Sequence, residues 1–250
     1  MSSYIFEGPL VKVRPSQYNK DMNRKHVFTL DEYYHIYNRG VEKRIVFQNT
    51  YDYHRFMLLL YFCNSNQPVD MEKVFREGRA FADMLETEKG KSLVAIGAWC
   101  LMPNHFHILI KEISENGITE FMRKVTTGYS MYFNKKYKRT GTLFEGKFKS
   151  EHVNNERFFK YIFSYIHLNP VKLAHGESKW KESGIKDNKK VENFLKNYSY
   201  SSFINYMDSN TKYENILAKK NFPDYFLDIN EHLEDMKDWL SNVKVGPSQN

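Results

Sequence analysis

The two histidines of His105-Phe106-His107 are the residues of this chain whose type and spacing first suggest chemistry. They lie inside an apolar run, rich in β-branched residues, that extends from Met102 to Ile110. Because side chains alternate between faces along a strand, His105 and His107 would share a face while Phe106 points into the core. Two imidazoles side by side provide two thirds of a metal site. A His-x-His pair is also commonly structural, so metal binding requires a third ligand from elsewhere in the chain.

A helix predicted over residues 156–169 can supply the missing groups. Its apolar stripe, which would pack on a sheet, consists of Phe158, Phe159, Ile162, Phe163 and Ile166. Tyr165 and Asn169 are four positions apart and therefore share a face beside that stripe. Tyr165 offers a phenol that can act as a nucleophile, and Asn169 offers a carbonyl oxygen. Taken alone, Tyr165 is more simply a packing tyrosine. Tyr161, one turn earlier, is either a core tyrosine or a second nucleophile, and we favour the core.

Three predicted strands and three predicted helices would position these groups. The strands lie at residues 33–38, 93–102 and 105–110, and the helices at 51–63, 117–137 and 156–169. Their order predicts an α+β fold, an antiparallel sheet with helices packed on one face. We expect a catalytic domain over residues 29–175, after an N-terminal extension of residues 1–28. Residues 176–250 would form a C-terminal, mainly helical appendage.

Several short segments, in the right order, resemble the single-tyrosine HUH transposases, named for a His-hydrophobic-His motif. His105-Phe106-His107 resembles that motif, and Tyr165-Ile166-His167-Leu168-Asn169-Pro170-Val171-Lys172 resembles the nucleophile helix. The segments 34–40 and 139–150 are similar to the first strand and the intervening segment of the REP-associated tyrosine transposase (RAYT) branch, alongside the IS200-like transposases. Residues 198–203 resemble an element near the C-terminal end of that branch. The resemblance spans roughly residues 30–205.

This resemblance implies a ferredoxin-like fold and metal-dependent cleavage and rejoining of single-stranded DNA at palindromic hairpins. It implies that Tyr165 forms a covalent 5′-phosphotyrosine intermediate, with Mg²⁺ or Mn²⁺ held by His105, His107 and Asn169. A phenol, with a pKa of about 10, is a poor nucleophile at neutral pH but a good leaving group. Covalent storage of the phosphodiester therefore suits strand transfer better than hydrolysis. Insertion-sequence relatives act as dimers, whereas the RAYT branch is expected to act as a monomer, which the likeness favours here.

Basic residues are concentrated between the two halves of the proposed site. Residues 121–150 contain eight basic residues and one acidic residue, so their net charge is 8 − 1 = +7, equal to the formal charge of the whole chain. We expect the backbone of single-stranded or hairpin DNA to bind there. The predicted DNA-binding residues are Arg123, Lys124, Lys135, Lys136, Tyr137, Lys138, Arg139, Lys147, Lys149, His167 and Lys172. The basic cluster at 135–139 is alternatively a solvated face. Lys12, Arg14, Arg24 and Lys25 of the extension are a second candidate surface.

The placement of the cysteines and the lengths of the apolar runs indicate the cellular compartment. Cys63 and Cys100 lie far apart in apolar runs, which predicts buried thiols in a reducing compartment and no disulfide framework. The longest apolar run, residues 56–62, is far shorter than the roughly 20 residues that a membrane span needs. With no apolar signal segment at the N-terminus, we expect a cytoplasmic protein.

Other functions remain open at this stage. The main alternative is a DNA-hairpin-binding protein that keeps the fold without using the chemistry. A replication initiator or relaxase shares the HUH motif, but the sequence contains no phosphate-binding P-loop. A metal-dependent hydrolase is less favoured, because there is no His-Glu-x-x-His motif and no acidic cluster beside His105.

Overall fold

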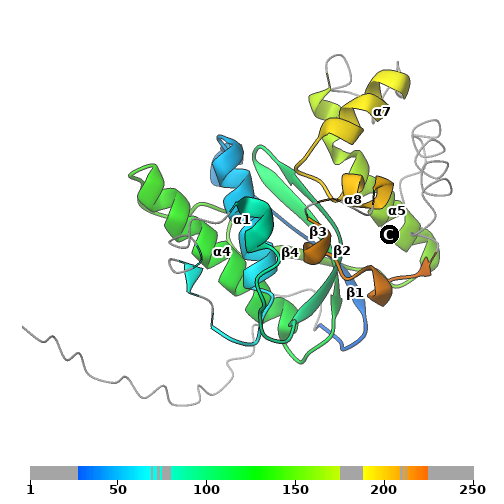
Figure 1. The fold of residues 1–250 in the computed structure, drawn as a ribbon, viewed down its shortest axis with the longest axis horizontal. Helices are drawn as coiled ribbons and strands as arrows, with labels where there is room; N and C mark the ends of the chain where they lie inside the picture. Colours follow the sequence, from blue (N-terminus) through cyan, green and yellow to red (C-terminus); the bar gives the residue numbers. More distant parts are fainter. Residues whose placement is uncertain are drawn as a thin grey trace, which may run out of the picture.

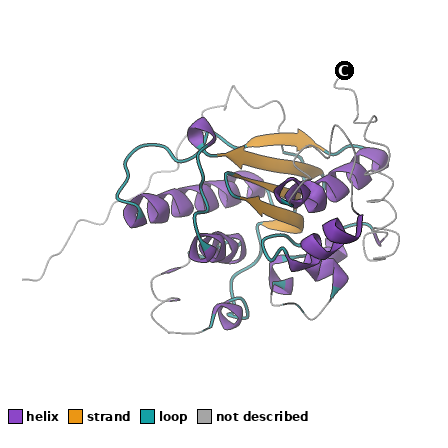
Figure 2. Ribbon diagram, turned by 90° about the horizontal axis from the view of Figure 1, so that it is seen from above, coloured by secondary structure: helices purple, strands orange, loops and turns teal. Residues whose placement is uncertain are grey.

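The computed structural model describes residues 28–174 and 188–224, apart from residues 69, 72–73, 75–79, 209–210 and 212. A four-stranded antiparallel sheet forms its centre (Figures 1 and 2). The strands are β1 (Tyr33–Arg39), β2 (Val94–Met102), β3 (His105–Glu112) and β4 (Lys149–His152). Their spatial order is β2-β3-β1-β4. The basic N-terminal extension up to residue 27 lies outside the described residues.

Helices connect and cover the strands. The longer ones are α1 (Thr50–Phe62), α4 (Gly117–Lys136), α5 (Glu156–Leu168) and α7 (Asn188–Asn197), and the short ones are α3 (Phe81–Met84) and α8 (Phe203–Met207). Single 3₁₀ turns lie at Val41–Lys43, Asn169–Leu173, Glu214–Ile216 and Lys219–Asn221. None of the described helices is long and apolar enough to cross a membrane.

The order of elements gives a ferredoxin-like arrangement. The helix α1 connects β1 to β2, and α4 connects β3 to β4, so each crossover skips one strand position. Both crossover helices pack on one face of the sheet, where the core includes Ile36, Phe106 and Ile108 from the strands (Figure 1). Phe106 is fully buried there, as its position between two histidines predicts. The predicted α+β class and antiparallel sheet are confirmed.

The prediction that the helices pack on one face is wrong for α5. This helix covers the opposite face, where Phe163 and Ile166 meet Cys100 and Leu109 (Figures 1 and 2). The physical reason lies in β2, in which every residue is buried. A strand that is apolar on both faces needs cover on both. The face covered by α5 is also the face that carries His105 and His107.

The described part of residues 188–224 packs against the edge strand β2. Ser201 forms a β-bridge with Cys100, and the hydroxyl of Tyr206 donates a hydrogen bond to the carbonyl oxygen of Gly97. A side chain at position 97 would clash with the ring of Phe222, because a Cβ atom there would lie 2.4 Å from the nearest ring carbon. The register of β2 also shifts at this position. The C-terminal region therefore closes the β2 edge and continues the fold.

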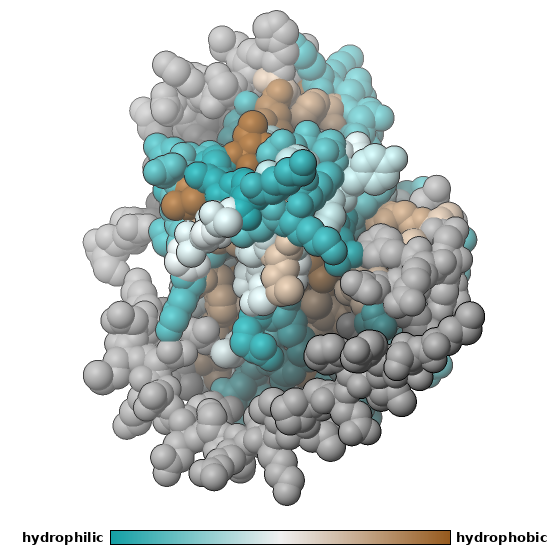
Figure 3. Space-filling model, turned by 90° about the vertical axis from the view of Figure 1, so that its left-hand side faces the viewer, coloured by the Kyte–Doolittle hydropathy of each residue, from teal (hydrophilic) through white to brown (hydrophobic). Residues whose placement is uncertain are grey.

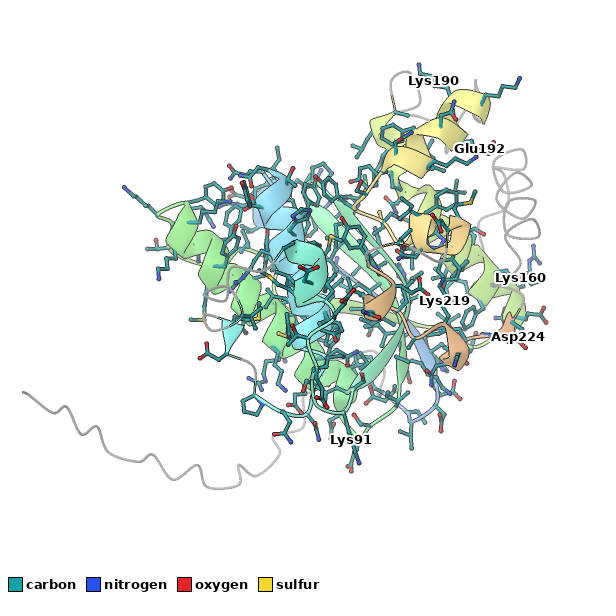
Figure 4. All side chains as sticks on the ribbon, viewed as in Figure 1. Lys91, Lys160, Lys190, Glu192, Lys219 and Asp224 are labelled. Atoms are coloured by element: carbon teal, nitrogen blue, oxygen red, sulfur yellow. The ribbon has the colours of Figure 1, made fainter. Side chains whose placement is uncertain are left out.

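Charged groups cover the outside of this core. The side of the molecule formed largely by α4 presents a mostly hydrophilic described surface with scattered apolar residues (Figure 3). Lys91 and Lys190 extend outward at opposite ends of the described structure (Figure 4). Lysine side chains therefore lie on more than one side of the described structure, and a candidate DNA surface is located from cavities and contacts.

Candidate active site

The strand with the histidine pair and the helix with the tyrosine meet at one cavity. This cavity has a volume of about 740 Å³ and is lined by His105, His107, Tyr165 and Lys172, among others. The ring centroids of His107 and Tyr165 are 5.4 Å apart with the planes at 85°. The rings of His105 and His107 are 5.1 Å apart. The contact between strand and helix exists because α5 lies on the histidine face of the sheet.

The turn between β2 and β3 fixes the first histidine. The carbonyl oxygen of Pro103 accepts hydrogen bonds from the backbone N–H groups of Val46 and Phe47, at 2.8 and 3.0 Å. Nδ1 of His105 lies 2.6 Å from Oδ1 of Asn104, and Nε2 of His105 lies 3.2 Å from Nζ of Lys172. Lys172 therefore occupies the neighbourhood of a predicted metal ligand and contributes positive charge to the cavity.

The second histidine has a partner that sequence reasoning missed. Nδ1 of His107 lies 2.9 Å from Nε2 of His35 on β1. From sequence we interpret His35 as structural, and its side chain is indeed buried. The signal that could have identified it is the β1 pattern Tyr33-Tyr34-His35-Ile36-Tyr37, which alternates faces and so places His35 and Tyr37 on the histidine face.

Tyr165 is half-enclosed by the sheet and the helix. Burial raises the pKa of its phenol, and the negative charge of Glu151 adds to the effect. The side chain of Asn169 acts in the opposite direction and lowers that pKa. Tyr161 stacks on Tyr165 with ring centroids 5.9 Å apart. Both tyrosines pack against the apolar cluster beneath α5, but of the two it is Tyr165 that lines the cavity, which is compatible with the core interpretation of Tyr161.

Asn169 is fully buried at the end of α5. Neither polar atom of its amide meets hydrogen-bond geometry with a residue that the structure describes. Unpaired buried amides are costly, so such a group is a candidate ligand. No cluster of three His, Cys, Asp or Glu side chains able to hold a metal exists within the described residues. Two imidazoles and this amide oxygen are a mixed nitrogen and oxygen donor set of the kind that binds divalent cations.

The predicted DNA-binding residues lie in several different places in the structure. Lys149 and Lys172 line the cavity with the histidines, where Arg39 and Lys43 join them. Glu145, the one acidic residue of segment 121–150, also lines this cavity. Its carboxylate accepts two hydrogen bonds from the guanidinium group of Arg39, each 3.0 Å long. Sequence reasoning did not single out Arg39 or Lys43, because neither belongs to a basic run.

A second cavity of about 660 Å³ lies beside the first. Ile45 and Pro103 line both cavities. The second cavity is also lined by Arg44, Arg139 and aromatic rings including Phe133. The guanidinium groups are of the kind that contacts nucleic-acid phosphates, whereas the rings of Phe47 and Phe133 are almost fully buried. Of the predicted DNA-binding residues, Arg139 lies here.

Other predicted DNA contacts are tied into the fold. Lys136 donates to the buried carboxylate of Asp52 at 2.6 Å, and the hydroxyl of Tyr137 donates to the same carboxylate at 2.7 Å. Lys124 pairs with Glu120 at 2.7 Å and lies twelve residues, about 18 Å of helix, before Lys136. Arg123 lies next to it. Lys135, Lys138 and Lys147 are exposed, and their contacts stay predictions.

The DNA contact predicted for His167 does not fit this structure. The side chain is fully buried, and its Nε2 lies 2.8 Å from the hydroxyl oxygen of Ser202. The rings of Phe163, Phe203 and Tyr206 surround it. A helical wheel places His167 away from the apolar stripe, but the C-terminal segment covers that side of α5. His167 therefore links α5 to residues 201–206.

A family model and a solved structure are similar to this chain. A search of curated proteins finds no match. Among solved structures, the chain is similar to a REP-associated tyrosine transposase bound to a REP hairpin, with 15% sequence identity and a TM-score of 0.43, over 83% of this chain and 94% of that one. Residues 33–169, more than half of the 250, match the family described as "Transposase IS200 like". The match begins at the first residue of β1 and ends at Asn169, so this chain belongs to the IS200-like transposase family.

Proposed function

We propose that this transposase cleaves and rejoins single-stranded DNA at palindromic hairpins, with Tyr165 as nucleophile and a divalent cation as cofactor. The observation that carries the proposal is that Tyr165 lines the same cavity as His105 and His107. His107 and Tyr165 are 58 positions apart in the sequence, and packing of α5 on the histidine face of the sheet brings them to one cavity. Lys149 and Lys172 line the same cavity, whereas Asn169 is buried at the end of α5.

The proposed reaction is an in-line displacement at phosphorus. The phenolic oxygen of Tyr165 attacks the scissile phosphodiester, a phosphorus–oxygen bond to tyrosine forms, and the bond to the 3′-oxygen breaks. The phenol releases its proton to solvent and the departing 3′-oxygen takes one up from solvent, so no net proton is consumed. Attack by a 3′-hydroxyl on the phosphotyrosine reverses the step. His105, His107 and Asn169 would hold the Mg²⁺ or Mn²⁺ ion, which supplies charge neutralisation and positioning of the phosphate.

The cations of the cavity have a separate task. Lys149 and Lys172 line it and would contact phosphate oxygens of the bound strand. Arg139, in the neighbouring cavity, would contact the unpaired strand that leaves the site. The exposed Lys135, Lys138 and Lys147 would add longer-range attraction. We further propose that the catalytic domain comprises residues 29–175 and acts as a monomer.

The test is formation of a covalent adduct. Wild-type protein incubated with a labelled hairpin oligonucleotide and Mg²⁺ or Mn²⁺ should yield a protein–DNA species that survives denaturing electrophoresis. Tyr165→Phe should abolish the adduct and retain hairpin binding, because only the nucleophilic oxygen is removed. Tyr161→Phe is the matched control, one turn earlier on the same helix, and should retain the adduct. An adduct that persists in Tyr165→Phe would show that the nucleophile is another residue.

A hairpin-binding protein without cleavage activity is the second candidate. One contact favours it, since Nζ of Lys172 lies 3.2 Å from Nε2 of His105 and an ammonium group there opposes binding of a cation. This candidate predicts tight hairpin binding with no adduct under either metal. It also predicts that Lys172→Met weakens hairpin binding without uncovering cleavage.

A further inference from the structure

His35 is a buried histidine for which the proposed reaction provides no role. It lies on β1 with 3% of its surface exposed, between His107 and Glu151. Its ring stacks on that of His107 with centroids 5.1 Å apart and planes at 17°. Nε2 of His35 lies 2.9 Å from Nδ1 of His107, and Nδ1 of His35 lies 3.6 Å from Oε2 of Glu151. The three side chains form a line that ends in the cavity.

The protons in this line can be placed by elimination. A hydrogen bond between two neutral imidazoles needs one N–H group and one lone pair. If His35 donated from Nε2, its Nδ1 would carry a lone pair facing the carboxylate of Glu151, and two acceptors would oppose each other. If His107 donates from Nδ1, His35 carries its proton on Nδ1, which faces the carboxylate of Glu151 across 3.6 Å. That distance is too long for a hydrogen bond, so the carboxylate acts on His35 by electrostatic attraction. The carboxylate therefore favours the second arrangement.

His105 shows the same arrangement with a different partner. Its Nδ1 lies 2.6 Å from the side-chain oxygen of Asn104, which can only accept, so Nδ1 carries the proton. Nε2 of His105 then carries the lone pair, and Nζ of Lys172 donates toward it at 3.2 Å. In both histidines a neighbouring side chain contacts Nδ1, so Nε2 is the nitrogen that would ligate a metal, and at His105 Lys172 would have to move from Nε2 first.

We propose that Glu151 and His35 are positioning residues that fix His107 as its Nδ1–H tautomer and hold its ring in the orientation for metal ligation. The functional consequence rests on the metal-dependent reaction proposed above. A hydrogen bond from the second ring nitrogen, such as the one between His107 and His35, raises the basicity of a ligating imidazole and fixes the direction of its lone pair. Loss of such a bond typically weakens metal binding about 10–100-fold.

The tautomer can be measured in the metal-free protein. Long-range ¹H–¹⁵N correlation spectra at about pH 8 distinguish Nδ1–H from Nε2–H imidazoles, and the signals of His107 are those lost in His107→Gln. We expect wild-type His107 to be the Nδ1–H form, and His35→Leu to convert it to a mixture or to Nε2–H. Wild-type His107 in the Nε2–H form, or an unchanged tautomer in His35→Leu, would overturn the proposal.

Metal affinity gives the second measurement. Titration with Mn²⁺ alone should show an affinity at least tenfold weaker in His35→Leu, with a smaller loss in His35→Gln, which retains a side-chain hydrogen-bonding group. Glu151→Gln, at a half-exposed position, should fold normally and weaken Mn²⁺ binding in the same direction. Equal Mn²⁺ affinity in wild type, His35→Leu and Glu151→Gln would contradict the positioning role.

His152→Leu is the matched control. His152 follows Glu151 on β4 and pairs with Glu32 at 2.9 Å, yet it stacks on Tyr34 on the other face of the sheet. It should change neither the tautomer of His107 nor the Mn²⁺ affinity. If wild-type protein binds no Mn²⁺ while His107 is still the Nδ1–H tautomer, the metal dependence of the proposed function fails and the positioning of His107 stands.

Discussion

At the scale of single residues, the buried amide of Asn169 is the group whose surroundings fit a ligand best. A side-chain amide without a hydrogen-bond partner costs about 1–3 kcal/mol when buried. The amide lies beside the phenol of Tyr165 and lowers its pKa against the larger effect of burial. Catalytic sites commonly retain groups that weaken the fold, because the same groups bind ligands.

We therefore predict opposite effects of Asn169→Leu on stability and on metal binding. An apolar side chain of similar size removes the unpaired amide, so the free energy of unfolding should be unchanged or higher by up to about 1 kcal/mol. Mn²⁺ affinity and adduct formation should fall sharply. Urea unfolding and Mn²⁺ titration of one preparation measure both quantities.

Asn64 provides the matched control for this prediction. It is also buried, but its amide makes three hydrogen bonds of 2.9–3.0 Å with the backbone of Leu93 and Val94. Asn64→Leu should lower the free energy of unfolding by about 2–3 kcal/mol and leave Mn²⁺ affinity unchanged. If Asn169→Leu destabilises the protein as much as Asn64→Leu does, the amide of Asn169 has a structural role.

At the scale of elements, the carboxylate of Asp52 joins the two crossover helices. Asp52 lies in the first turn of α1 and is fully buried. It accepts hydrogen bonds from Tyr132, Lys136 and Tyr137 at the C-terminal end of α4, and from the backbone N–H of Gln48. These bonds hold its pKa below the usual 3.8 although burial alone would raise it. The hydrogen bonds of Asp52 join α1 to α4, and both helices pack on the face of the sheet opposite the histidines.

Asp52→Asn should lower the free energy of unfolding by about 2 kcal/mol at pH 7, because charge-assisted hydrogen bonds are lost. The lowered pKa means that this stabilisation is present above pH 3.8 and disappears as the pH falls through the lower folded-state value. Urea unfolding of wild type and variant should therefore differ at pH 7 and converge in strong acid.

The surface pair Glu120–Lys124 on the same helix is the control for Asp52. Its charges are i, i+4 neighbours and partly exposed, so Glu120→Gln should change the free energy of unfolding by less than about 0.5 kcal/mol. A difference between Asp52→Asn and wild type that stays constant down to pH 2 would contradict the assignment to the charged carboxylate.

At the scale of the whole molecule, buried tyrosine hydroxyls connect segments that are distant in sequence. Tyr129 donates to the carbonyl of Val46, Tyr198 to that of Leu101 and Tyr206 to that of Gly97. Burial raises the pKa of all three phenols, and it raises that of Tyr53 to about 12. The folded protein thus binds these protons more tightly than the unfolded chain does.

We predict that the contribution of these tyrosines to the free energy of unfolding is constant below about pH 10 and falls steeply above it. A raised folded-state pKa means that the unfolded chain ionises first, near pH 10, and the stabilisation is lost as the pH rises toward the folded value. Tyrosinate absorbance at 295 nm and circular dichroism should change together in one transition above pH 11. Gradual ionisation of these tyrosines near pH 10 with intact circular dichroism would contradict this prediction.

The sequence by itself indicated which residues could form the site. The period of two places His105 and His107 on one face, and the spacing of four aligns Tyr165 with Asn169. The order of strands and helices predicted the antiparallel α+β fold, and the motifs indicated the family to which the chain belongs. These features depend on local periodicity and composition, which neighbouring residues decide.

Only the tertiary structure decided which side chains from distant parts of the sequence come into contact. It placed α5 on the histidine face, brought His35 and Glu151 to His107, and buried His167 under the C-terminal segment. It also showed that Lys136 and Tyr137 bind Asp52 and that Arg39 and Lys43 line the cavity. The physical reason is that a helical wheel gives the direction of each side chain relative to its own helix. Which face of the sheet receives that helix depends on covering both apolar sides of β2, a long-range requirement.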